Sequence, residues 1–426
     1  MSVRNPGYWP SPWPGEDGGP ARLQDVLDHD LTFSGPDVHV TFREGVATTM
    51  AVLREPDEVF VLRHVPGPDA VSWVERIDPR SLEVLERSAD LPGGPTWPGG
   101  IAAHENGSLY VVFGRHAHRL DASLQLIASC TLPRNRPYNS FVILPDGSLV
   151  TKDFGGVLPG TDPATHVYEP TELVVLDPEH LEVVARCELS EASIARLAAD
   201  GDAVYVVGVT TLWRVRWDGT ALDVDPDFAP RYCTVSGQTY GWDPVIALGA
   251  AWFLDNGFGS ERYVGTFLGQ GVNVAPLHLV RVDLGDGSVS LTEICGRPGG
   301  VVANPPLIDA RRRIAVGFDS GNGVLVGFDI ADDGTCTRRW EHDQAHASHL
   351  LLIADTGEFL STDHDANRMM DALVVRDITT GAQRCRVDSG SLVQSVLFPA
   401  CGWHDDVYYC SFAGIARLAA YGDAHG

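Results

Sequence analysis

A unit of about 50 residues recurs along the chain, and each copy has the pattern of a small antiparallel sheet. A hairpin turn such as Glu105-Asn106-Gly107 or Pro145-Asp146-Gly147 precedes a short apolar run that is typical of a strand. The second-strand residues that mark successive copies are Phe60, Tyr110, Val150, Tyr205, Phe253, Ala315, Leu360 and Tyr409. This spacing is that of a propeller blade.

An alternating apolar run that stops at an aspartate follows the marker in most copies, as in Leu173 to Asp177. The aspartate is predicted to cap the turn into a fourth strand. A four-stranded blade cannot shield both of its faces alone, so such units are stable when they pack radially into a closed ring. We therefore predict an all-β chain that forms a β-propeller of eight four-stranded blades, with seven blades as the alternative.

The last copy, Val396 to Tyr421, has only three strands of its own. The alternating run Asp37 to Phe42 is predicted to supply the fourth strand and to close the ring by pairing the two termini. This divides the chain into residues 1–36, an extended segment rich in Pro and Trp, and residues 37–426, a single propeller domain. The segment is too stiff for a helix, and we expect its aromatic side chains to pack against the propeller flank or another protomer.

The composition excludes several kinds of partner. Thirty-one basic and 57 acidic residues give a net charge of -26, which repels phosphate backbones and anionic membranes. No stretch reaches about 18 uncharged apolar residues, and residues 1–20 lack the basic and apolar regions of a signal peptide. We expect a cytoplasmic protein with a small-molecule ligand and neither nucleic acid nor membrane as partner. Its oligomeric state is left open.

The sixth copy resembles the repeat of quinoprotein-type (PQQ-repeat) propellers. The resemblance rests on Asn304 to Asp309, Ala315 to Gly321, Gly327 to Ile330 and Trp340, and it implies that Trp340 docks between blades. The eight cysteines are placed singly, without the adjacent cysteines of quinoprotein dehydrogenases, so we expect no PQQ. A second stretch, Arg136 to Asn139 before Pro145 to Leu149, is similar to the Asn-bearing, metal-binding blade of gluconolactonase-like lactonases.

The predicted site lies where the loops into each first strand and the loops from second to third strands converge. Two of the latter, Phe154 to Thr171 and Asp255 to His278, are far longer than a hairpin needs and are predicted to be lids or protomer contacts. The ligand-binding candidates at this end are the polar or aromatic residues Asn139, Trp242, Asp255, Asn256, Asn304 and Asp319.

The catalytic candidates are two pairs. Lys152 and Asp153 end an apolar strand, where they could orient an anionic substrate or exchange a proton; the alternative is a salt bridge between blades. If both face the channel, His349 and His364 would form either a metal-binding pair or a general base with its orienting partner; otherwise they are surface or capping histidines.

Asp363, His364 and Asp365 form the densest group of candidate metal ligands in the sequence. Carboxylate oxygens favour Ca²⁺ or Mg²⁺, so a divalent cation is one hypothesis for this group, and a hydrogen-bonded turn is the other. No nucleophile elbow, P-loop or Rossmann glycine motif occurs in a suitable setting. The sequence favours an enzyme that acts on a small molecule at the channel mouth, as a metal-assisted hydrolase or lyase. The alternative is a non-catalytic propeller that binds a ligand or a protein.

Overall fold

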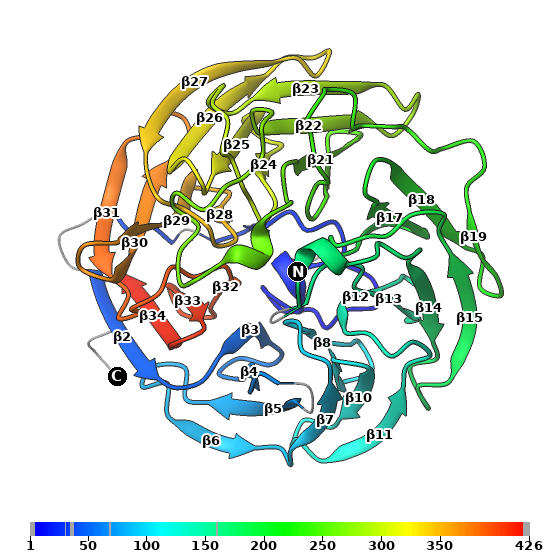
Figure 1. Ribbon diagram of the computed structural model, residues 1–426. Coiled ribbons are helices and arrows are strands. Elements are labelled where there is room, and N and C mark those ends of the chain that lie inside the picture. The colour runs from blue at the N-terminus through cyan, green and yellow to red at the C-terminus, as the bar shows by residue number, and fades with distance from the viewer. Residues whose placement is uncertain (1–4, 30, 35–37, 68–69, 159–160, 421–426) are drawn as a thin grey trace.

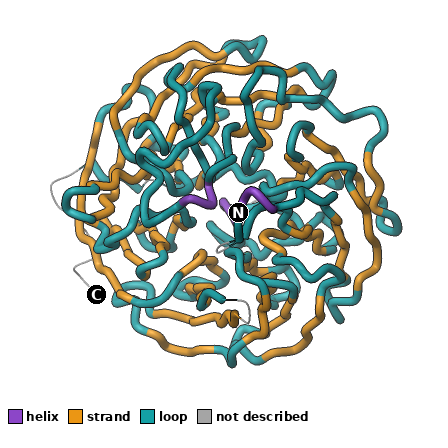
Figure 2. The backbone as a smooth tube through the Cα atoms, in the orientation of Figure 1, coloured by secondary structure: helices purple, strands orange, loops and turns teal. Residues whose placement is uncertain are grey.

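The computed structural model describes residues 5–29, 31–34, 38–67, 70–158 and 161–420. Eight sheets, each built around four antiparallel strands, surround a central axis, as Figure 1 shows, so the prediction of an all-β propeller with eight blades is confirmed. The described part contains three short helical turns, η1 (Glu16–Gly18), η2 (Pro163–Thr165) and η3 (Ser260–Arg262). In the view of Figure 2 these turns lie near the axis, inside the ring of strands.

The first four blades follow one another along the chain, each with its first strand innermost. Blade 1 consists of β3 (Thr48–Leu53), β4 (Val59–His64), β5 (Ala70–Ile77) and β6 (Val84–Arg87), with β7 (Leu91–Gly94) also paired to β5. Blade 2 consists of β8 (Gly100–Ala103), β9 (Leu109–Phe113), β10 (His116–Leu120) and β11 (Leu126–Thr131). Blade 3 consists of β12 (Tyr138–Ile143), β13 (Leu149–Asp153), β14 (Glu172–Leu176) and β15 (Val183–Glu188). Blade 4 consists of β16 (Ala198–Asp200), β17 (Ala203–Val207), β18 (Leu212–Trp217) and β19 (Leu222–Val224).

The other four blades keep the same order, with additions from the N-terminal part of the chain in blades 7 and 8. Blade 5 consists of β20 (Val245–Ala247), β21 (Ala250–Leu254), β22 (His278–Asp283) and β23 (Val289–Glu293). Blade 6 consists of β24 (Leu307–Asp309), β25 (Ile314–Asp319), β26 (Val324–Ile330) and β27 (Cys336–Asp343). Blade 7 consists of β28 (Leu351–Ile353), β29 (Glu358–Asp365), β30 (Met370–Asp377) and β31 (Gln383–Asp388), with β1 (Asp25–Val26) parallel to β28. Blade 8 consists of β32 (Pro399–Cys401), β33 (Asp406–Ser411), β34 (Gly414–Ala420) and β2 (Val38–Glu44).

Strand β2 closes the ring, as predicted. It pairs antiparallel with β34 from Val38 opposite Ala420 to Glu44 opposite Gly414. Asp37, the first residue of the predicted strand, lies outside the described residues. The eighth blade is therefore built from both ends of the chain.

Inner and outer strands differ in burial. An inner strand is enclosed because its blade packs between two neighbours, whereas the fourth strand lies at the rim. Every residue of β9 is buried, whereas β15 alternates between exposed and half-buried residues. The predicted aspartate turns join third to fourth strands: Asp78 Oδ1 accepts the Ser81 N–H at 2.7 Å, and Asp121 Oδ1 accepts the Gln125 N–H at 2.9 Å. The local sequence thus fixes both the pleat and the turns of a blade.

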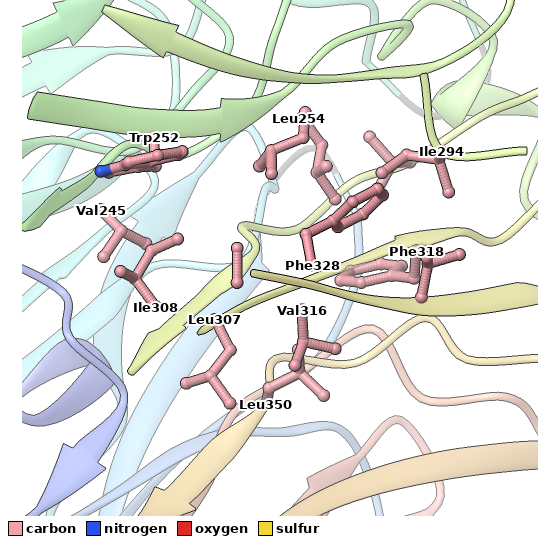
Figure 3. Close-up of a cluster of buried hydrophobic side chains, with 14 of the residues drawn as sticks. Val245, Trp252, Leu254, Ile294, Leu307, Ile308, Val316, Phe318, Phe328 and Leu350 are labelled. Atoms are coloured by element: carbon pink, nitrogen blue, oxygen red, sulfur yellow. The ribbon is translucent and has the colours of Figure 1, made fainter. Parts of the chain in front are cut away.

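The cores between blades are apolar. Figure 3 shows Leu254 and Ile294 of blade 5 beside Phe318 and Phe328 of blade 6. Trp340 of β27 docks on blade 7, where its Nε1 donates to the Ile378 carbonyl at 2.8 Å and its ring lies 6.0 Å from that of Phe359. This is the inter-blade tryptophan that the quinoprotein-like repeat implied, and the eight cysteines are all free thiols.

Much of the N-terminal segment lies in the channel, whereas we expected it on the flank of the propeller or on another protomer. Its backbone bonds to the innermost strands of several blades: Trp9 N–H donates to Ala103 of blade 2, and Pro20 and Ala21 accept from Ala199 of blade 4 and Ile246 of blade 5. The physical reason is that innermost strands turn an unpaired edge of N–H and C=O groups towards the axis, and an extended segment can satisfy them. Trp13 is fully buried there. Within the residues that the structure describes, no helix is long and apolar enough to cross a membrane.

Candidate functional site

A cavity of about 540 Å³ opens at the mouth of the channel. It is lined by the loops into the first strands of seven blades and by second-to-third loops, which is the end at which the sequence predicted a site. Its aromatic lining consists of Trp97, Trp242, Tyr263, Phe267, Phe398 and Phe412. Its polar lining includes His64, Arg196, Glu261, Asn304 and His349. A concave, mostly apolar pocket with few polar groups is typical of a small-molecule site.

His349 is held in the cavity wall by a carboxylate from the N-terminal segment. Its Nδ1 lies 3.0 Å from Asp17 Oδ1, and both side chains are buried. The ring also stacks on Phe398, with the centroids 3.8 Å apart. Burial alone would raise the pKa of Asp17, but the charges of His349 and Arg22 outweigh burial and hold that pKa below its ordinary value. The pair therefore fixes the orientation of the imidazole.

A buried ion cluster lies behind this wall; we call Glu16, Asp17, Arg22, Arg196 and Asp243 the floor cluster. Arg22 contacts three carboxylates, Glu16 at 2.8 Å, Asp17 at 2.6 Å and Asp243 at 3.0 Å. Arg196 Nη1 lies 3.2 Å from Glu16 Oε1. The charges of these carboxylates raise the pKa of Arg22, although burial opposes them. The cluster thus joins the N-terminal segment to blades 4 and 5 through buried ion pairs.

Arg196 has most of its donors occupied. Its Nη2 donates to the Pro98 carbonyl at 2.8 Å and its Nη1 to the Gly99 carbonyl at 3.2 Å. Its guanidinium carbon lies 4.7 Å from the centre of the Phe398 ring. Arg196 therefore shapes the cavity floor more than it offers free positive charge.

Three of the predicted site residues line the cavity: His349, Trp242 and Asn304. The Asn304 amide donates to the carbonyls of Ala347 and Val396, which leaves its oxygen as the group that can accept from a ligand. Trp242 is nearly parallel to Trp97, at an angle of 17° and a centroid distance of 6.4 Å. The roles predicted for these residues remain predictions.

Four predicted aspartates lie at the ends of second strands and hold loop backbone instead of lining the cavity. Asp153 Oδ1 accepts the Glu172 N–H at 2.7 Å, and Asp255 Oδ1 accepts the His278 N–H at 2.7 Å. Asp319 Oδ1 accepts the Asn322 N–H at 3.0 Å, and Asp363 Oδ1 accepts the Ala345 N–H at 2.8 Å. One blade position thus recurs as a loop-fixing carboxylate. Asn256 has a related role, because its amide donates to Ala275 within the long loop of blade 5.

Lys152, the single lysine of the chain, is fully buried and does not line the cavity. Its Nζ bonds to three uncharged oxygens: Asn139 Oδ1 at 3.4 Å, Asp153 O at 3.3 Å and Ser193 O at 3.2 Å. The Asp153 carboxylate instead pairs with Arg136 at 2.7 Å, so the two predicted catalytic partners do not form an ion pair with each other. Burial lowers the pKa of Lys152 to about 7.

His364 and its neighbours lie on β29 and do not line the cavity, whereas His349 does. Asp363 also pairs with Arg386, and Asp365 Oδ1 accepts the Asn367 N–H at 2.9 Å, as in a hydrogen-bonded turn. Burial lowers the pKa of His364. Among the described residues, no group of three or more His, Cys, Asp or Glu side chains is arranged to hold a metal ion. Cation binding by Asp363, His364 and Asp365 therefore stays a prediction.

Sequence reasoning missed Asp17, Arg196, Glu261 and the aromatic walls. Asp17 could not be placed because the path of the N-terminal segment lies outside the blade repeat. Glu261 and Tyr263 belong to the long loop Asp255 to His278, which the sequence did single out for its length. In Figure 1 its helical turn η3 lies over the central axis.

Comparisons with known proteins find similarity in fold but not in sequence. No protein-family model matches the sequence, and no curated protein matches it. A europium-containing methanol dehydrogenase is similar in structure with a TM-score of 0.62, at 10% identity over 95% of this chain and 89% of the other. BamB from Moraxella catarrhalis gives a TM-score of 0.54, at 12% identity over 88% of this chain and 99% of the other. The computationally designed Ika8 protein gives a TM-score of 0.56, at 10% identity over 89% of this chain and 98% of the other.

These likenesses define a class. The chain is an eight-bladed β-propeller, similar in fold to the methanol dehydrogenase and to BamB, with a ligand-sized cavity at the mouth of its channel. At such low identities the likeness extends to the fold alone.

Proposed function

We propose that the protein is an enzyme that binds a small, largely apolar molecule in the cavity and uses His349 to remove or deliver a proton. The observation that carries the proposal is the Asp17–His349 pair in the wall of an apolar cavity. With Nδ1 bonded to Asp17, the other ring nitrogen, Nε2, is the one left to exchange a proton with a ligand. Asp17 is then a positioning residue, and His349 is the catalytic residue.

A lyase fits this wall better than a hydrolase. Elimination needs one positioned base, whereas hydrolysis also needs donors for a developing oxyanion. The Asn304 amide and three Arg196 N–H groups already donate to protein oxygens or face Glu16. We therefore propose proton abstraction as the central step.

The base-promoted ring opening of 5-nitrobenzisoxazole tests the proposal, because it needs only a base in an apolar site. The base takes the proton on carbon, the N–O bond breaks, and a coloured cyanophenolate forms. We expect the protein to accelerate this reaction and His349→Gln to lower the rate by about 100-fold or more. Asp17→Asn should lower it less, with a changed pH profile, since it removes the charged partner of the ring and leaves the imidazole in place.

His180→Ala is the matched control, because His180 is exposed on an outer turn and is expected to leave the rate unchanged. Equal rates for wild type and His349→Gln, in protein shown to be folded by circular dichroism, would refute the base. The non-catalytic alternative is favoured by one observation, that most polar groups of the wall are already engaged within the protein. Probe binding without acceleration would support it.

A divalent cation (Ca²⁺ or Mg²⁺) at Asp363, His364 and Asp365 is a separate proposal that His349 does not require. Titration of chelator-treated protein with CaCl₂ and MgCl₂ in a calorimeter checks it.

A further inference from the structure

Aromatic side chains line the cavity in two groups. In the first, Trp97 and Trp242 line the cavity, and Phe154, which is not part of the lining, stacks on Trp97 with centroids 4.1 Å apart. In the second, Tyr263 lies 5.1 Å from Phe267 and 6.0 Å from Phe412, measured between ring centroids. The faces of such rings carry partial negative charge and attract cations that come within about 6 Å.

Glu261 contributes a carboxylate to the lining of the same cavity. It follows Ser260 in η3 and precedes Tyr263. Its Oε2 accepts the Gly259 N–H at 3.1 Å, while Oε1 is buried with no hydrogen-bond partner. The ion pairs of the described residues include none with Glu261. A buried carboxylate oxygen without a partner is costly unless a ligand satisfies it.

The other side chains of the lining that can carry charge do not oppose Glu261. Burial lowers the pKa of His64 to about 4, so His64 is neutral near pH 7. Arg196 faces Glu16 and His349 faces Asp17, and the floor cluster counts three carboxylates against two guanidiniums. The net charge of the chain, -26, acts in the same direction.

We infer that the ligand of this cavity is an organic cation, an ammonium group on an apolar or aromatic body. The ammonium pairs with Glu261 and lies against the aromatic faces, and the apolar body fills the rest of the cavity. This deepens the proposed function, on which it rests, because it names the charge and class of the molecule that His349 would act on.

Isothermal titration with three probes that share one aromatic ring tests the inference: benzyltrimethylammonium, uncharged benzyl alcohol and the anion phenylacetate. We expect the cation to bind at least about 10-fold more tightly than either of the others. Glu261→Gln should weaken binding of the cation by about 10-fold or more and leave binding of benzyl alcohol nearly unchanged. Glu182→Gln removes the same charge from an exposed outer turn and should change nothing.

The outcomes separate the two proposals. Benzyl alcohol binding as tightly as the cation, or equal effects of Glu261→Gln and Glu182→Gln, would overturn the cationic ligand and leave the base at His349 standing. Failure of all three probes to bind would count against the cavity as a ligand site and hence against both. If Glu261→Gln lowers the melting temperature, titration of the wild type at rising NaCl gives the same test, since only cation binding should weaken with salt.

Discussion

Replacing Arg22 by Met is expected to lower the free energy of unfolding by about 3–5 kcal/mol. The Arg22 guanidinium is buried within 3.0 Å of carboxylates from Glu16, Asp17 and Asp243. The variant would leave three buried carboxylates with Arg196 as the remaining guanidinium of the floor cluster. Chemical denaturation at neutral pH, followed by tryptophan fluorescence, measures the change.

Arg368→Met is the matched control for this prediction. Arg368 pairs with Asp388 on the surface, where an ion pair contributes only about 0–1 kcal/mol. If both variants lost equally little stability, the floor cluster would not be what fastens the N-terminal segment in the channel.

Replacing Lys152 by Met should abolish a rise of stability with alkaline pH. The pKa of Lys152 falls from 10.5 in the unfolded chain to about 7 in the fold. Below pH 7 the amine is charged in both states, and the fold bears the full cost of a buried charge. Between pH 7 and pH 10.5 the folded protein is neutral at this site while the unfolded chain still binds the proton, so raising the pH favours folding. From pH 6 to pH 9.5 the wild type should gain roughly 2–4 kcal/mol that Lys152→Met does not gain.

The difference in the free energy of unfolding between the wild type and Lys152→Met, taken at each pH, removes the contributions of the titrating groups that the two proteins share. Because the chain has one lysine, labelling with [¹⁵N]lysine gives one side-chain signal, whose titration reports the pKa directly. A midpoint near 10, or parallel pH curves for the two proteins, would show that Lys152 is solvated or has gained a charged partner.

The blade repeat made the fold readable from the sequence. Turn residues such as Asp78 and Asp121, the alternating strands and the incomplete last copy each depend on local chemistry, and together they predicted eight blades and the strand that closes the ring. Trp340 could be assigned to an inter-blade contact for the same reason.

The site was less accessible to sequence reasoning. A polar residue next to an apolar strand has the same sequence pattern whether it lines the cavity, as His349 does before β28, or holds a loop, as Asp153, Asp255 and Asp319 do. The choice depends on the path of the neighbouring backbone. Asp17 shows the limit most clearly, because its partner lies 332 residues away in the chain.

The pairing of β2 with β34 sets the order in which the protein can be completed on the ribosome. Val38 to Glu44 are synthesised before any of the blades that follow them, yet their partners, Gly414 to Ala420, belong to the eighth blade. The N-terminal segment likewise cannot complete its backbone hydrogen bonds until blades 4 to 7 have been synthesised. A nascent chain must therefore carry an unpaired strand and an unpacked tryptophan-containing segment until the eighth blade has been made, which exposes it to misassembly. A premature stop within the last blade would release an open arc with two bare edges, and not a slightly smaller ring.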